Sequence, residues 1–350
     1  MMDKKVDTLM FPFTDPPEQG LAQEVAEGVL WLRISLPMAL DHVNVYVLDD
    51  GDGWVVVDTG MDTRRGRAFW RAVLKGPLRG KPIKRVIVTH HHPDHIGLAG
   101  WFQTQHGAEL VTTRTAWLMA RMLVLDEHPV PTEETVAHWR AGGMKPEMLA
   151  KRVDARPVNF ADMVSPLPLG FTRIAEGDVL HIGGRDWIVR VGHGHAPEHA
   201  TLWSDDGKIV IGGDQLLPSI SPNLGVYATE PLADPVSEWL ESCERLAGYA
   251  THEQLVLPGH KLPFTGLPIR LDQMIDNHHS ALARLMDFLD EPRTAAECFK
   301  PLFRRRIADS EYGLALVEAQ AHVNHLLHKD LVEVSTREDG AWLWARKVQD

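Results

Sequence analysis

The side chains best suited to chemistry lie in one short segment of the chain. His90, His92, Asp94 and His95 follow the spacing His-x-His-x-Asp-His. Neutral imidazoles together with a carboxylate are typical ligands of zinc, with iron and manganese as alternatives. Alternation along an extended segment points His90 and His92 in the same direction, whereas Asp94 and His95 fall in a turn and can face a second point. The pattern therefore predicts a metal site, and a histidine-rich surface turn is the competing interpretation.

The sequence on either side of this motif indicates which elements position it. Residues 83–88 are rich in β-branched side chains and predict a buried strand, whereas residues 97–102 can open a helix. The motif is therefore expected where a strand ends and a helix begins. Helices are predicted at 64–74 and 238–246, and strands at 28–34, 43–48, 54–57, 109–111, 179–182, 187–191, 200–203, 209–211 and 254–257. This alternation of helices and strands predicts an α/β fold.

Four more segments carry a histidine or an aspartate close to glycine. They are residues 57–60 (VDTG), 194–199 (GHAPEH), 211–214 (IGGD) and 257–260 (LPGH). Together with the His-x-His-x-Asp-His motif they resemble the signature of the metallo-β-lactamase superfamily, over about residues 29–260. The second segment is similar to the family's G-H-T-P-G-H. The resemblance implies an αββα sandwich, in which two similar β-layers are flanked by helices.

The resemblance also implies a ligand set for two divalent metal ions, with zinc expected and iron or manganese as alternatives. A catalytic site of this kind lowers the pKa of a bridging water to about 7 and stabilises the oxyanion of the attacked group. Asp58 is expected either to orient the ligands, as the resemblance implies, or to serve as a cap or turn former at the end of its strand, and Asp94 is also counted as catalytic. His199 is expected either near the substrate or in a structural role. The implied ligands are His90, His92 and His195 for one metal, Asp94, His95 and His260 for the other, and Asp214 as the bridge.

Several residues near these motifs receive no catalytic role from the sequence. Glu198 stands where the family has a small residue, and His193 has no counterpart in the family, so neither is assigned a function. His91 is expected to point away from the metals. His278 and His279 are predicted to lie on a solvated helix face.

Residues 113–165 interrupt the pattern of strands with helices rich in large apolar residues. They predict a helical insertion, either as plain apolar interior or as a lid with an acyl pocket. Methionine suits a pocket that adapts to flexible chains. The predicted pocket residues are Trp117, Met122, Leu217 and Tyr227.

The chain is expected to divide into three parts. Residues 1–20 are rich in proline and predict an irregular arm, and residues 21–266 form the catalytic domain with its insertion at about 113–165. Residues 267–350 predict helices followed by a two-stranded hairpin. That order is typical of a winged helix, and some members of the family carry such a domain.

Composition restricts the partners and the compartment. The net charge of −12 disfavours nucleic acid or an anionic membrane as a partner. The 2 cysteines and the absence of a signal-peptide pattern at the N-terminus predict a cytoplasmic protein. We therefore expect a hydrolase of small acyl compounds, with thioesters favoured and lactones, other esters or β-lactams as further candidates. The alternative is a phosphodiesterase or ribonuclease fused to a winged helix, and a homodimer is left open.

Overall fold

The computed structural model describes residues 8–347, which belong to two compact units. The first unit takes in the chain up to Glu127, Asn159–Pro222 and Leu246–Leu271. The second unit takes in His128–Val158, Asn223–Arg245 and the chain from Asp272 onward. Residues 1–7 of the predicted arm lie outside the described residues, and residues 8–20 are irregular apart from a bridge between Met10 and Thr265.

A seven-stranded sheet forms the first layer of strands in the first unit, in the order β1-β2-β3-β4-β5-β6-β7. Strands β1 to β4 pair antiparallel, and β4 to β7 pair parallel. All four residues of β4 are buried, which explains its uninterrupted apolar sequence. The strands are β1 (Gln23–Ala26), β2 (Val29–Ser35), β3 (His42–Asp49), β4 (Trp54–Val57), β5 (Ile83–Ile87), β6 (Glu109–Thr112) and β7 (Thr172–Arg173).

A five-stranded sheet forms the second layer, in the order β12-β11-β10-β9-β8. Only β11 and β12 pair parallel, and the other neighbours pair antiparallel. The strands are β8 (Val179–Ile182), β9 (Arg185–Gly192), β10 (His199–Ser204), β11 (Ile209–Gly213) and β12 (Leu255–Pro258). The sequence predicted all five of these strands, but it missed the short β1 and β7 of the first sheet.

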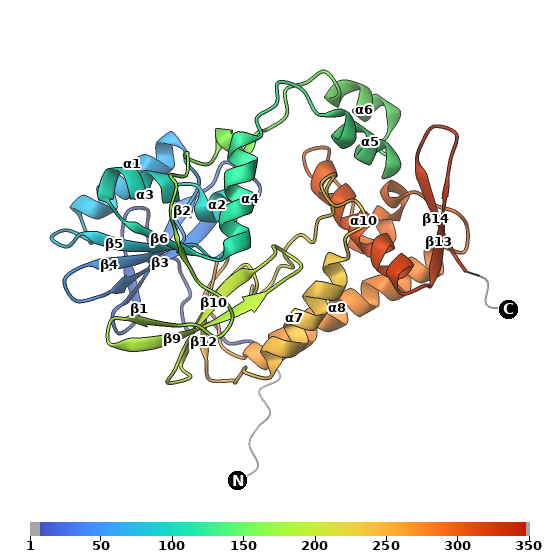
Figure 1. Ribbon diagram of the computed structural model, residues 1–350. Coiled ribbons are helices and arrows are strands. Elements are labelled where there is room, and N and C mark those ends of the chain that lie inside the picture. The colour runs from blue at the N-terminus through green and yellow to red at the C-terminus, as the bar shows by residue number, and fades with distance from the viewer. Residues whose placement is uncertain (1–7, 348–350) are drawn as a thin grey trace, which may run out of the picture. The chain divides into compact units, whose positions relative to one another are not determined.

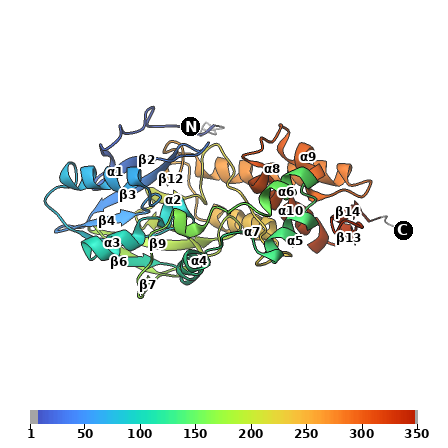
Figure 2. The same cartoon turned by 90° about the horizontal axis from the view of Figure 1, so that it is seen from above.

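Strand β3 divides the core of the first unit into two apolar layers. Val45 and Val47 belong to a cluster that also contains residues of α1 (Arg64–Lys75) and α3 (Ala99–His106). Tyr46 and Leu48 belong to a second cluster, which contains residues of both sheets. Successive side chains of a strand point to opposite faces, so one face of this sheet packs on helices and the other on the second sheet. Figures 1 and 2 show α1 and α3 beside the seven-stranded sheet.

Two further helices and a short 3-10 turn complete the description of the first unit. Helix α2 (Pro93–Ile96) follows the metal motif, and α4 (Arg114–Leu125) begins just after β6. Thr113 caps α4, because its hydroxyl accepts a hydrogen bond from the backbone N–H of Ala116. A 3-10 turn, η1 (Phe160–Asp162), lies against α4.

The second unit is mainly helical. It contains α5 (Glu133–Ala141), α6 (Pro146–Arg152), most of α7 (Pro235–Ala247) and α8 (Leu267–Phe288), η2 (Ala295–Cys298), α9 (Phe299–Phe303), α10 (Tyr312–His328) and the hairpin of β13 (Val332–Thr336) and β14 (Trp342–Arg346). Residues 128–158 of the predicted insertion cluster with the C-terminal residues in this unit. The domain boundaries and the winged-helix interpretation stay predictions. Among the described residues, no helix is long and apolar enough to cross a membrane.

The expected position of His278 is wrong. Its side chain is only 3% exposed, and it stacks on His322 of α10 instead of facing solvent. The neighbouring His279 is exposed, as predicted. The apolar residues of α8 determine which of two adjacent histidines turns inward, and a pair of histidines alone does not reveal this.

Candidate metal centre

The His-x-His-x-Asp-His motif lies between strand β5 and helix α2. The strand ends at Ile87, and α2 begins at Pro93, a position where proline is favoured because no N–H is needed there. His90 and His95 are fully buried, whereas His92 and Asp94 are half-buried. The short turn therefore directs four side chains of the motif into the interior of the first unit.

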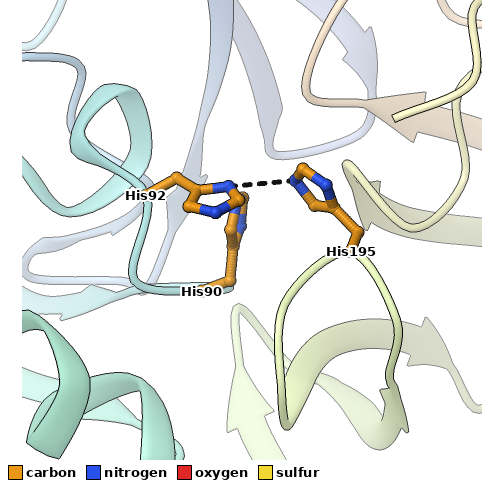
Figure 3. Close-up of side chains that lie close together, drawn as sticks. All are labelled: His90, His92 and His195. Atoms are coloured by element: carbon orange, nitrogen blue, oxygen red, sulfur yellow. Dashed lines mark hydrogen bonds between the residues drawn. The ribbon is translucent and has the colours of Figure 1, made fainter. Parts of the chain in front are cut away.

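The first group of ligand atoms comes from two histidines of this turn and from His195. The Nδ1 atom of His92 lies 3.0 Å from Nε2 of His90 and 3.0 Å from Nε2 of His195 (Figure 3). One nitrogen from each ring lies within 4.8 Å of the others. Residues 103 positions apart in the sequence are thus brought together by the loop that joins β9 to β10.

The second group contains Asp94, His95 and His260, whose ligand atoms also lie within 4.8 Å of one another. Asp214 follows β11 and lies between this group and the first one. Its Oδ2 atom lies 3.5 Å from Nε2 of His195 and 3.2 Å from Nε2 of His260, and its Oδ1 lies 3.4 Å from Nε2 of His95. The structure therefore brings all seven predicted ligands together and places the Asp214 carboxylate between the two groups.

The hydrogen bonds behind the ligands determine which ring nitrogen faces the centre. His95 donates from Nδ1 to Oδ2 of Asp58 at 2.8 Å, and His260 donates from Nδ1 to the carbonyl oxygen of His42 at 2.7 Å. In both rings Nε2 is then the nitrogen that faces the carboxylates and is available to bind a cation or a proton. Sequence reasoning missed His42, because it lies 218 positions from His260 and has no motif of its own.

These residues fit a pair of divalent cations. Lone pairs of Nε2 and carboxylate oxygens face one another, and only a cation or a proton between them removes the repulsion. Nε2 of His95 and Oδ1 of Asp214 have no hydrogen-bond partner among residues 8–347. A β-carbon at Gly259 would lie 2.2 Å from Oδ1 of Asp214, so only glycine leaves room there.

The electrostatic environment differs between the two groups of ligands. Burial lowers the pKa of His90 and His92 well below the usual range, so both rings are neutral and ready to bind metal. Burial also lowers the pKa of His260, but the carboxylates of Asp214 and Asp94 outweigh it and raise that pKa to about 10. The second group therefore attracts positive charge strongly, as the site of a cation should.

Asp58 and His199 lie behind the ligands. Asp58 accepts from the backbone N–H and from the hydroxyl of Thr89, both at 2.8 Å, besides its bond from His95. It adopts a φ of 61°, a strained value for a residue with a side chain. His199 is fully buried, and its Nε2 accepts the backbone N–H of Asp214 at 3.1 Å. Asp58 thus holds the motif, and His199 holds the backbone of Asp214.

The four predicted pocket residues lie in different surroundings. Trp117 is part of the core and stacks on Phe171 with ring centroids 4.8 Å apart. Leu217 is fully buried, whereas the Met122 side chain is 46% exposed. Tyr227 belongs to the second unit. Trp117 and Met122 are five positions apart on α4 and so point to different sides of the helix, which the apolar composition of residues 113–165 did not reveal.

Comparison with known proteins identifies the family. Residues 38–260 match the sequence profile of the Metallo-beta-lactamase superfamily. The chain belongs to this superfamily. Residues 282–347 match a second profile, described as a metallo-beta-lactamase-like C-terminal domain. The predicted α/β fold, that of the metallo-β-lactamases, is therefore confirmed.

Individual relatives agree with this assignment. The chain is 34% identical to a beta-lactamase domain protein from Burkholderia ambifaria, whose structure superimposes with a TM-score of 0.90 over 97% of this chain and 98% of that one. A metallo-beta-lactamase family protein from Thermus thermophilus is 26% identical, with a TM-score of 0.76 over 93% of this chain and 100% of that one. The probable metallo-hydrolase YqjP of Bacillus subtilis is 26% identical over 86% of this chain and 92% of its own length. The chain is thus a metallo-hydrolase of the superfamily.

Proposed function

We propose that the protein is a dinuclear zinc hydrolase that cleaves small acyl compounds with an apolar chain, with thioesters as the favoured class. The observation that carries the dinuclear part is the position of the Asp214 carboxylate, which lies within 3.5 Å of ligand nitrogens in both groups. Two metals held by these groups would supply a water of lowered pKa and would polarise the group under attack.

The residues of the chain contribute by fixing protons and lone pairs before substrate arrives. Asp58 and the carbonyl of His42 hold the Nδ1 protons of His95 and His260, so each Nε2 stays free for a metal. Asp94 is the site carboxylate with the larger exposed fraction, 14% against 9% for Asp214. We assign Asp94 the acceptance of a proton from the attacking water, because it has the better access to solvent.

The exposed face of α4 is our candidate for holding the apolar chain. Leu118, Met122 and Leu125 are 53%, 46% and 70% exposed. Their spacing places them on one side of the helix, opposite the buried Ala116 and Ala120. An exposed apolar stripe of this kind is typical of a binding surface. The proposed binding surface for the apolar chain therefore contains Leu118 and Leu125 in place of the predicted Trp117, and it keeps Met122.

Distant relatives support a substrate with an apolar chain. The acyl-coenzyme A thioesterase MBLAC2 of Homo sapiens is 23% identical over 68% of this chain and 80% of its own length. A linear primary-alkylsulfatase of a Pseudomonas strain is 24% identical over 69% of this chain, but this chain spans only 45% of that enzyme. Alkyl sulfates are therefore a second candidate class, and both classes carry a hydrocarbon chain.

A substrate panel combined with metal analysis tests this proposal. The protein is loaded with zinc and offered acyl thioesters, lactones, β-lactams, alkyl sulfates and a phosphodiester. We expect thioester hydrolysis whose kcat/KM rises with acyl length, by about fourfold for each buried methylene at most. Phosphodiester cleavage that falls steeply with salt would contradict the acyl proposal and favour a nuclease. A rate that does not change with chain length would remove the role of α4.

A further inference from the structure

Glu198 lies in the loop that carries His195, in an unfavourable backbone conformation. Its φ is 50°, in the left-handed region that residues with a β-carbon rarely adopt. Such a residue persists only where its contacts offset the strain. The contacts of Glu198 therefore indicate what the side chain does for this loop.

Contacts of Glu198 reach the start of α4 and also stabilise its own loop. The Oε2 atom of Glu198 accepts the backbone N–H of Thr115 at 2.8 Å, and its carbonyl oxygen accepts the hydroxyl of Thr113 at 2.8 Å. Its own N–H donates to Nδ1 of His193 at 3.3 Å. Thr113 and Thr115 form the N-terminus of α4, where backbone N–H groups lack partners within the helix. Glu198 thus caps a helix that is 83 positions away in the sequence.

The loop between Glu198 and His195 is short and stiff. Only Ala196 and Pro197 separate the two residues, and Ala196 is 1% exposed. Proline fixes its own φ, which removes one of the few rotations that could absorb a displacement. On the other side of Glu198, His199 accepts the backbone N–H of Asp214. A movement of Glu198 is therefore transmitted to a predicted ligand on one side and to the bridging residue on the other.

We propose that Glu198 is a positioning residue that fixes the His195 loop to the N-terminus of α4. The metal ligand and the helix then move as one body. The effect of Glu198 on metal binding does not depend on the identity of the substrate. A second consequence, that an acyl chain on α4 is held at a fixed distance from the metals, rests on the proposed function.

The test compares three substitutions at this position by loading metal-free protein with cobalt(II). Glu198→Gln keeps an oxygen that accepts from Thr115, so its cobalt affinity and visible spectrum should match the wild type within about twofold. Glu198→Ala removes that acceptor. We expect the weaker-binding of the two metal sites to lose about tenfold in cobalt affinity, and we expect the visible spectrum of the bound cobalt to change. Glu198→Gly also lacks the acceptor but suits a φ of 50°, so it should fold and show the same loss.

The control is Thr132→Ala, which removes the cap of α5 in the second unit. This control should lower thermal stability to a similar degree and leave cobalt binding unchanged. If Glu198→Gly binds cobalt like the wild type, the side chain of Glu198 does not position the His195 loop, and the proposal is wrong. Unchanged cobalt binding in Glu198→Ala overturns it as well, whatever the substrate proves to be.

Kinetics test the second consequence once a substrate is in hand. In Glu198→Ala we expect KM to rise more for long acyl chains than for short ones, and Glu198→Gln should restore the wild-type pattern. An equal change at every chain length would overturn the link to α4. A panel without any hydrolysed acyl compound would overturn the proposed function, whereas the cobalt result would stand by itself.

Discussion

Each unit contains a cluster of buried histidines, and the two clusters differ in the groups that their ring nitrogens face. In the first unit the nitrogens of the metal centre converge on the carboxylates of Asp94 and Asp214. In the second unit His278 stacks on His322, with Nδ1 of the first ring 3.4 Å from Nε2 of the second. Within residues 8–347, every group of three ligand atoms that could hold a metal lies in the first unit.

The comparison shows that burial of histidine alone does not predict a metal site. Burial lowers the pKa of His278 to about 3 and that of His322 to about 4, so these rings are neutral packing residues. In the first unit the carboxylates reverse the effect of burial and raise the pKa of His260 to about 10. Carboxylates that face the lone pairs of imidazoles therefore distinguish a candidate metal centre from a histidine-rich core.

Removing the carboxylate between the two groups should have the largest effect. Asp214→Ala deletes the oxygens that contact His95, His195 and His260. We expect hydrolysis to fall by about a thousandfold or more, because several kcal/mol of transition-state stabilisation depend on the metals. Rates and bound metal are measured together. Asp205→Ala, at an exposed aspartate, is the matched control, and equal activity in the two variants would contradict the assignment.

Substitution of Asp58, which accepts the Nδ1 proton of His95, should have an intermediate effect, a loss of metal affinity. Asp58→Asn places an amide N–H₂ opposite either the backbone N–H of Thr89 or the Nδ1 proton of His95 and the hydroxyl of Thr89 together, so at least one of the present hydrogen bonds is lost. We expect metal affinity to fall by about 10- to 100-fold. Competition with a chelator measures this change. An unchanged affinity would mean that Asp58 serves only the backbone of the turn.

The motif positions were predictable from the sequence because the ligands follow local patterns. Spacing in the motif around His90 and short glycine-containing segments around His195, Asp214 and His260 were sufficient. The partners behind the ligands were not predictable, since the contact between His42 and His260 depends on how β3 passes the end of β12. The role of Glu198 was hidden for the same reason, because its partner Thr115 lies in another element.

Acid should destabilise the second cluster. The pKa values of His278 and His322 are lowered from 6.5, so the unfolded chain binds more protons between about pH 6.5 and pH 4. Stability present above pH 6.5 is then lost as the pH falls, by about 2 kcal/mol for one such histidine between pH 7 and pH 5. Residues His279, His325 and Asp234 also act on these two rings.

The variant His278→Leu removes one titrating ring and should show a shallower loss of stability between pH 7 and pH 5. Urea unfolding at both pH values measures the difference. Burial raises the pKa of Glu318 to about 7, which gives the opposite slope, but this slope is common to both proteins and cancels in the comparison. An identical acid sensitivity would show that His278 is not the group that titrates.

The smallest effect, no change in metal content, is expected for a substitution in the histidine cluster of the second unit. His325 donates to Asp234 at 3.0 Å, and His322 donates to the carbonyl of Glu318 at 2.8 Å. Because these nitrogens are occupied, His325→Gln should leave the metal content of the protein unchanged. Elemental analysis after dialysis measures it. Loss of a bound metal would show that the second cluster is a metal site after all.

The most direct test of the central claim is a zinc titration of the metal-free protein, with bound zinc counted per chain. The two groups of ligands and the shared carboxylate of Asp214 predict two equivalents in the wild type. They also predict that Asp214→Ala weakens both. A wild-type protein that saturates with one zinc or fewer, or an Asp214→Ala variant that binds two as tightly as the wild type, would contradict the dinuclear account.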